Sequence, residues 1–283
     1  CSSDLIAASA EPVFRVGAYA IDVSPLELPV IVNGGMTERT VDKIEDRLHA
    51  RCLVLDDGSQ TIAIVVVDNC MMPRSLLDDA KKIAAAATGI AANRILISAT
   101  HTHSAPSVHG CLGSDADENY SRFLPSQLAK GIAQAQKNLE PAQVGWSVGR
   151  DEKNVASRRW LMKPGVAPTN PYVGRTGDLA QMHPGYGNVN AIRPTGPVDS
   201  SVPVLAIRTA RGEPLAVLTN YSMHYVGKPA LSADYFSLVC DQMTRLLQAE
   251  NRKPAFVAIH SNGTSGDAWL MDYTKPQIGR AHV

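Results

Sequence analysis

The sequence has no excess of charge, no long apolar run and no closely spaced pair of cysteines. Lys+Arg and Asp+Glu each number 27, so the net charge is zero and nothing indicates a nucleic-acid partner. No apolar run approaches the ~20 residues of a transmembrane helix, so we expect no membrane-spanning segment. The internal cysteines form no CxxC metal or redox motif, and we interpret them as small buried residues. They are Cys52, Cys70, Cys111 and Cys240.

The two ends of the chain match sequencing-adapter DNA. Residues 1–5 can be encoded by TGC TCT TCC GAT CT, whose reverse complement translates as Ile-Gly-Arg-Ala, and these four residues follow from Ile278. We therefore exclude residues 1–5 and 278–283 from fold reasoning. We predict one catalytic domain over residues 6–277, incomplete at its C-terminal end. Ala8-Ser-Ala10 has the small-x-small pattern of a signal-peptidase site, which predicts export to the periplasm or the exterior.

The order of apolar runs and turns predicts an α/β (α+β) fold with mixed β-sheets and flanking helices. Asp56-Asp57-Gly58 indicates a hairpin, and Pro73 and Gly89 bracket a helix. Because hairpins alternate with helical crossovers, the sheet should be mixed. We expect strands at 14–23, 51–55, 61–68, 94–99, 143–149, 202–209, 215–221 and 255–260, helices at 73–88, 119–139 and 234–250, a loop at 29–47, and a functional loop or cap at 160–200.

The most informative motif is His101-Thr-His103, which closes a buried strand. On an extended segment, side chains at i and i+2 point to the same side. Two imidazoles on one face at a strand end can begin a zinc site, although exposed loop histidines fit the pattern about as well.

Two later strand ends repeat this arrangement. The strand from Leu215 leads to His224, and the strand from Phe256 leads to a loop with Gly263, Gly266 and Asp267. Three imidazoles, or two and a later carboxylate, would form an open catalytic zinc site. The glycines allow backbone amides to approach a bound group, and Asp267 can orient a ligand or cap a helix.

These motifs carry a family resemblance. Ala99-Thr-His-Thr-His-Ser-Ala-Pro106 resembles the THTHSGP signature of the neutral/alkaline (non-lysosomal) ceramidases. Asn220-Tyr-Ser-Met-His224 resembles the second histidine motif of that family, and Asn262-Gly-Thr-Ser-Gly-Asp267 resembles its Gly-Asp loop. Order and rough spacing agree over nearly all of residues 13–270. The resemblance implies a ceramidase-like catalytic domain and a zinc amidase that cleaves an N-acyl bond.

The resemblance also implies roles for single residues. It assigns zinc to His101 and His224, and it places His103 beside the metal, where it could move protons. It places an arginine near the substrate amide, for which Arg158 and Arg159 are both candidates. Asp267 joins these catalytic candidates.

The Gly-Asp loop supplies the predicted substrate-binding residues. They are Gly263, Ser265, Gly266 and Trp269. The sequence departs from the family here, because Trp269 stands where ceramidases carry an essential serine. The remaining family ligands, a Glu and a Tyr, would follow Gln277.

The prediction is therefore a zinc-dependent hydrolase of an amide or ester bond in a small-molecule or lipid-like acyl substrate. The developing oxyanion would be held by an arginine or by a backbone amide between Gly263 and Gly266. Amidohydrolase barrels usually carry HxH on the first strand, and metallo-β-lactamases need an Asp where this chain has Ala105, so both are disfavoured. The non-enzyme alternative is an inactive ceramidase-like domain that binds a lipid or glycan. The sequence does not indicate the oligomeric state.

Overall fold

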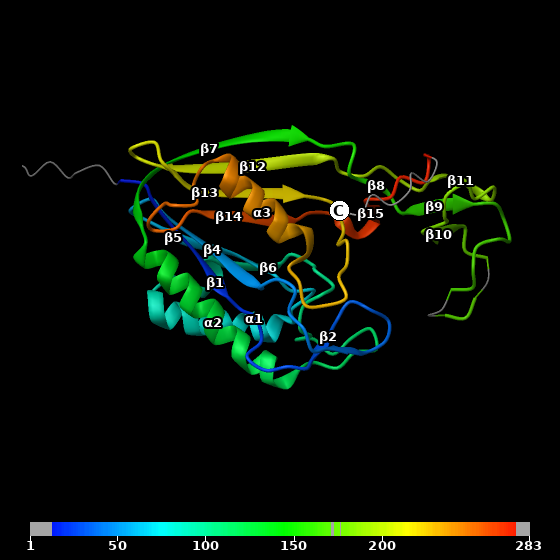
Figure 1. The fold of residues 1–283 in the computed structure, drawn as a ribbon, viewed down its shortest axis with the longest axis horizontal. Helices are drawn as coiled ribbons and strands as arrows, with labels where there is room; N and C mark the ends of the chain where they lie inside the picture. The colour runs from blue at the N-terminus through cyan, green and yellow to red at the C-terminus, as the bar shows by residue number, and fades with distance from the viewer. Residues whose placement is uncertain (1–12, 171–172, 176, 276–283) are drawn as a thin grey trace, which may run out of the picture.

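The centre of the molecule is an eight-stranded mixed sheet with the order β14-β13-β12-β7-β1-β4-β5-β6 (Figure 1). The computed structural model describes residues 13–170, 173–175 and 177–275, so both expected adapter segments and the Ala8-Ser-Ala10 pattern lie outside the described residues. The strands are β1 Arg15–Asp22, β4 His49–Asp56, β5 Thr61–Val67, β6 Ile95–Ala99, β7 Glu140–Arg150, β12 Ser201–Thr209, β13 Pro214–Tyr221 and β14 Val257–Asn262. The predicted mixed sheet is confirmed.

The helices begin and end near the predicted residues. They are α1 Arg74–Thr88, α2 Glu118–Lys137 and α3 Asp234–Leu246, with short 3₁₀ turns η1 Ala92–Arg94 and η2 Ser265–Asp267. Gly89 ends α1 in the left-handed region at φ 76°, and its amide donates to the carbonyl of Ala85. Asp117 caps α2 by accepting from the amide of Tyr120. Among the described residues, no helix combines the length and the apolar character needed to cross a membrane.

The sheet folds over on itself, so that β14 contacts β4, β5 and β6. Figure 1 shows β7, β12, β13 and β14 above the layer formed by β1, β4, β5 and β6. Alternate residues of each strand face opposite sides, which divides the core into layers. Leu53 and Val66 face Ala216 and Ile259 in the space between the two sheet halves. The opposite faces of β4 and β5 pack on α1 and α2, and those of β13 and β14 pack on α3.

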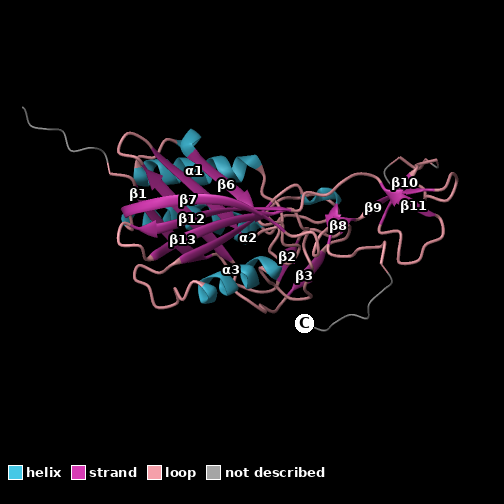
Figure 2. Cartoon of the chain, turned by 90° about the horizontal axis from the view of Figure 1, so that it is seen from above, coloured by secondary structure: helices cyan, strands magenta, loops and turns pink. Residues whose placement is uncertain are grey.

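Three small sheets lie outside the central one, two of them in segments expected to be loops. β2 Val30–Val32 pairs with β3 Arg39–Val41, so residues 29–47 are not wholly irregular. β9 Arg159–Met162 pairs with β10 Ala180–Met182 and β11 Ala191–Pro194, so the 160–200 segment contains a three-stranded sheet. β8 Ala156–Ser157 pairs with β15 Ala268–Trp269. Both views show the three-stranded sheet at one end of the molecule (Figures 1 and 2).

Two parallel strand pairs determine where a site can form. β5 runs parallel to β6, and β13 runs parallel to β14, whereas the other pairs of the central sheet are antiparallel. The pairs occupy the two edges of the sheet, and the fold brings these edges together. The carboxyl ends of parallel strands are where α/β proteins bind ligands.

Candidate metal centre

Each strand of the two parallel pairs delivers a residue to one cluster. Cys70 follows β5, His101 and His103 follow β6, His224 follows β13, and Ser265 lies in η2 after β14. The functional side chains therefore leave their strands at one place. Residues more than a hundred positions apart become neighbours because the sheet is folded over.

The three imidazoles lie against one another. The ring centroids of His101 and His103 are 4.6 Å apart, those of His101 and His224 are 4.8 Å apart, and those of His103 and His224 are 5.5 Å apart. The Nε2 atoms of His101 and His103 are 3.0 Å apart. The structure thus brings both predicted metal ligands and the predicted proton-transfer residue into one group.

The local geometry of the histidine pair differs from the prediction. β6 ends at Ala99, and His101 adopts a left-handed φ of 72° instead of extended backbone. Its amide donates to the carbonyl of Asn69 over 2.9 Å, which fixes this conformation. The two rings therefore meet because the chain turns, and the prediction that they share one face of a strand is wrong.

Backbone carbonyls orient two of the rings. Nδ1 of His101 lies 2.8 Å from the carbonyl oxygen of Cys70, and Nδ1 of His224 lies 3.0 Å from that of Ser265. A carbonyl only accepts, so each Nδ1 carries the proton, and each Nε2 keeps its lone pair. Metal-binding histidines are commonly fixed in this way.

The cluster favours neutral imidazoles. Burial, followed by the neighbouring His101 and His224, lowers the pKa of His103 to about 3. Burial, followed by the charge of Arg158, lowers the pKa of His224 to about 4. A neutral imidazole is the form that binds a metal ion, so the site needs no deprotonation of these two rings at pH 7.

Cys70 is a neighbour of the cluster that the sequence analysis assigned to the core. Its Sγ lies 3.8 Å from Nδ1 of His101, and Cys70, His101 and His103 each offer a ligand atom within 4.8 Å of the others. Burial raises the pKa of the Cys70 thiol to about 12, which makes the imidazoles the readier ligands. Its position just after β5, the strand parallel to β6, was the available signal.

His103 is held between a glycine and a tyrosine that the sequence analysis did not select. The ring of Tyr225 stacks on it, with centroids 3.5 Å apart and an interplanar angle of 15°. On the backbone of Gly34, at φ +105°, a Cβ would lie 2.5 Å from Cγ and Nδ1 of His103. Gly34 lies within the segment expected to be a loop, and both its positive φ and this close approach to His103 favour glycine.

The structure separates the two candidate arginines. Nε of Arg158 donates to the carbonyl of Gly266 over 2.9 Å, and its Cζ lies 5.8 Å from the ring centre of Trp269. Arg159 instead forms an ion pair with the carboxylate of Asp267, with both side chains about half exposed. Arg158 is therefore the arginine beside the cluster, and Arg159 and Asp267 occupy each other at its rim. The catalytic roles of all three stay predictions.

The Gly263–Gly266 loop supplies carbonyl groups to the site, and most of its backbone amides already donate hydrogen bonds within the protein. The amides of Gly263, Thr264 and Ser265 donate to Tyr221 O, Ser222 Oγ and Gly263 O. A Cβ on Gly263 would lie 2.4 Å from Ser222 Oγ, so this glycine permits close packing of two strand ends. These three amides therefore already have acceptors within the protein, and the oxyanion role predicted for the loop stays a prediction.

Trp269 covers one side of the imidazole cluster. Its ring centroid is 5.6 Å from that of His224 and 5.0 Å from that of Tyr225. His183, from the 160–200 segment, also packs edge-on against the indole, with ring centroids 5.1 Å apart. The residue in the place of the family serine is thus a wall of the site.

A depression of about 570 Å³ opens beside the rings, and His101 and His224 line it together with Gly263, Ser265 and Gly266. Met71, Met72 and Leu77 form its apolar side. Imidazole, carbonyl and thioether groups thus border a space large enough for a small substrate. Three of the predicted substrate-binding residues, Gly263, Ser265 and Gly266, therefore line this opening, whereas Trp269 does not, and the role of all four stays a prediction.

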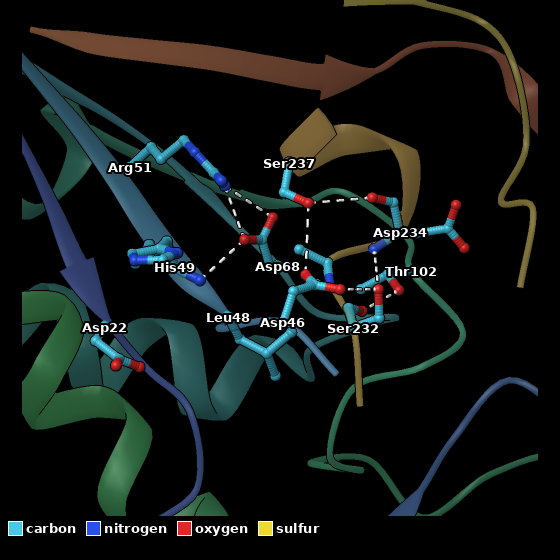
Figure 3. Close-up of polar contacts among 12 residues, drawn as sticks. Asp22, Asp46, Leu48, His49, Arg51, Asp68, Thr102, Ser232, Asp234 and Ser237 are labelled. Atoms are coloured by element: carbon cyan, nitrogen blue, oxygen red, sulfur yellow. Dashed lines mark hydrogen bonds and ion pairs between the residues drawn. The ribbon is translucent and has the colours of Figure 1, made fainter. Parts of the chain in front are cut away.

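A buried polar network holds the segments that carry the histidines (Figure 3). Thr102 Oγ1 donates to the carbonyl of Ser232 over 2.8 Å, and the hydroxyl of Ser232 donates to Asp46. Asp234 is the first residue of α3, as predicted, but its carboxylate accepts from the amides of Val226 and Gly227. It therefore fixes the loop after His224 without touching an imidazole directly.

Comparison with solved structures finds the same fold in neutral ceramidases. A crystal structure of neutral ceramidase from Pseudomonas aeruginosa matches with a TM-score of 0.73 and 17% identity, covering 97% of this chain. A ceramidase complexed with C2 matches with a TM-score of 0.69 and 17% identity, covering 91%. The chain spans 42% and 39% of the length of those two chains. No model of a protein family and no curated protein matches the sequence. The likeness shows a neutral-ceramidase-like fold, whereas membership of that family stays a prediction.

Proposed function

We propose that this chain carries the metal site of a zinc-dependent hydrolase that cleaves an amide or ester bond. The observation that supports the proposal is the convergence of His101, His103 and His224 at the meeting point of the two sheet edges. Imidazole donors with fixed tautomers suit zinc, and the depression beside them leaves space for a substrate.

Zinc would be held by Nε2 of His101 and of His224, with Cys70 or His103 as further ligand candidates; among the described residues, Cys70, His101 and His103 are the group whose ligand atoms lie within 4.8 Å of one another. When bound, zinc would supply Lewis acidity to a carbonyl group and lower the pKa of water. His103 lies beside these rings and would be the group that accepts a proton. The half-buried guanidinium of Arg158 is available to stabilise negative charge that develops on a carbonyl oxygen. Trp269 excludes bulk water from one side of the cluster.

Metal analysis of matched variants tests the proposal. The purified protein, loaded with zinc and desalted, should retain about one zinc per chain, and His101→Ala together with His224→Ala should abolish this retention. The exposed His109 provides a control, because His109→Ala removes an imidazole away from the cluster. Equal zinc retention in the double variant and in the control would contradict the site. Zinc-loaded protein should also hydrolyse p-nitrophenyl acetate faster than the double variant.

A binding domain without catalysis is the second candidate. Trp269 supports it, because an indole packs against His224 where ceramidases carry their serine. Protein that retains zinc but hydrolyses neither short N-acyl nor ester probes would favour this candidate.

A further inference from the structure

Arg158 is a half-buried cation without an anionic partner among the residues that the structure describes. Its Nε donates to the carbonyl of Gly266, and its backbone amide donates to the carbonyl of Asp267. The nearby carboxylate of Asp267 is taken up by Arg159. Burial and the charge of Arg159 lower the pKa of Arg158, which means that its surroundings disfavour a positive charge. A bound anion would remove that penalty.

The carboxylate of Asp267 acts on Arg158, but it is already paired with Arg159. None of the residues that line the depression is acidic. The imidazoles of His103, His183 and His224 lie close enough for Arg158 to lower the pKa of each of them. A bound divalent cation would make the local potential still more positive. This charge distribution suits a carboxylate, which a guanidinium can bind through two parallel hydrogen bonds.

Aromatic rings gather beside the same cation, although aromatic residues make up only 5% of the sequence. Trp269 lies under the guanidinium of Arg158 and contacts Tyr225 and His183. Tyr273 accepts or donates a hydrogen bond at Nδ1 of His183 and packs on Tyr186, with centroids 5.1 Å apart. Such a wall favours a planar ring in an offset or edge-to-face arrangement.

From this juxtaposition we propose that the substrate is an N-acylated amino acid with an aromatic side chain. Its carboxylate would bind Arg158, its ring would pack on the wall of Trp269 and Tyr225, and its N-acyl bond would lie over the imidazole cluster. The inference rests on the proposed hydrolase function. In the reaction, the C–N bond of the amide breaks, the hydroxyl of water joins the acyl carbon, and a proton of water goes to the amine. The products are a carboxylic acid and a free amino acid, and no oxidant or reductant is needed.

Two compounds that differ in one group test the inference. N-acetyl-L-phenylalanine carries the carboxylate, and N-acetyl-L-phenylalaninamide lacks it, so acetate release from each by zinc-loaded protein isolates the role of the charge. A charge-assisted contact predicts a kcat/KM that is about tenfold to hundredfold higher for the acid. Arg158→Gln should remove the preference by raising KM for the acid alone, whereas a loss of oxyanion stabilisation would lower kcat for the acid and the amide by the same factor and leave their ratio unchanged. Arg158→Lys should restore part of the preference.

Arg193→Gln provides the control, because Arg193 is an exposed arginine of the adjoining small sheet. It should leave the preference unchanged. Equal kcat/KM for the two compounds in the unmodified protein would overturn the inference, and so would an unchanged preference in Arg158→Gln. If p-nitrophenyl acetate is hydrolysed while the acid is not preferred, the inference fails and the hydrolase proposal stands.

If neither compound is hydrolysed, calorimetric titration of the protein with each of them tests the carboxylate site by binding alone. Tighter binding of the acid than of the amide, lost in Arg158→Gln, would support the carboxylate site and contradict the hydrolase. Absence of this difference would contradict both.

Discussion

Replacing one partner of the buried Arg51–Asp68 ion pair should destabilise the protein strongly. The side chains are 7% and 0% exposed, and Arg51 Nη1 lies 2.9 and 2.7 Å from the two carboxylate oxygens of Asp68. Asp68 also accepts from the amide of His49 (Figure 3). The carbonyl of the next residue, Asn69, accepts from the amide of His101. Asp68→Asn would leave a guanidinium uncompensated in the interior, which costs about 3–5 kcal/mol.

Urea unfolding can measure this loss. A domain of this kind has a total stability of about 5–15 kcal/mol, so the midpoint should shift far with little change in slope. The double variant Arg51→Met/Asp68→Leu should recover most of the loss, because no charge remains buried. The exposed pair Arg74–Asp78 provides a control, and Asp78→Asn should change stability by less than about 1 kcal/mol. The electrostatic reasoning would be refuted if Asp68→Asn lost no more stability than Asp78→Asn. It would also be refuted if the double variant were no more stable than Asp68→Asn.

Three other perturbations should have distinct effects. Gly34→Ala should weaken zinc retention by displacing His103, and it should lower the free energy of unfolding by at least about 1–2 kcal/mol. Gly89→Ala is the control: its Cβ would meet open space, so it should lower stability without affecting zinc retention. The pKa of His260 is lowered by burial to about 4, below the ~6.5 of an unfolded chain, so the unfolded state binds the extra proton between these values. Stability should therefore fall between pH 6.5 and 4, by on the order of 3 kcal/mol from this group, and urea titrations of His260→Gln should show a shallower fall. Zinc at about a hundred times its Kd should raise the unfolding free energy by about 2.7 kcal/mol, and calorimetry should show no such rise in His101→Ala.

The main strands and helices could be predicted because their signals are local and strong. Asp57 and Gly58 lie in the four-residue connection between β4 and β5, and Pro73 and Gly89 bracket α1 as expected. The short strands β2, β3, β8 to β11 and β15 were missed, because two to four residues are too few to show an alternating pattern. Their pairing depends on neighbours that are distant in sequence.

The candidate site was predictable only as a set of residues. Strand ends rich in small polar residues indicated His101, His103 and His224, and the structure brings these three together. The left-handed turn at His101 and the stacking of Tyr225 on His103 depend on tertiary contacts that a linear pattern does not encode. Cys70 was missed for a similar reason, since a cysteine after an apolar strand resembles any buried core residue.

The meeting of the two sheet edges has a consequence for the way in which the protein matures. Because His101 leaves one edge and His224 leaves the other, a chain that has paired only half of its strands offers no complete set of donors. A bound ion would then link the two sheet edges, and its release would weaken the contact between them. A substitution that weakens the contact between the two sheet edges should therefore also lower the affinity for the cation, even when it lies far from any imidazole.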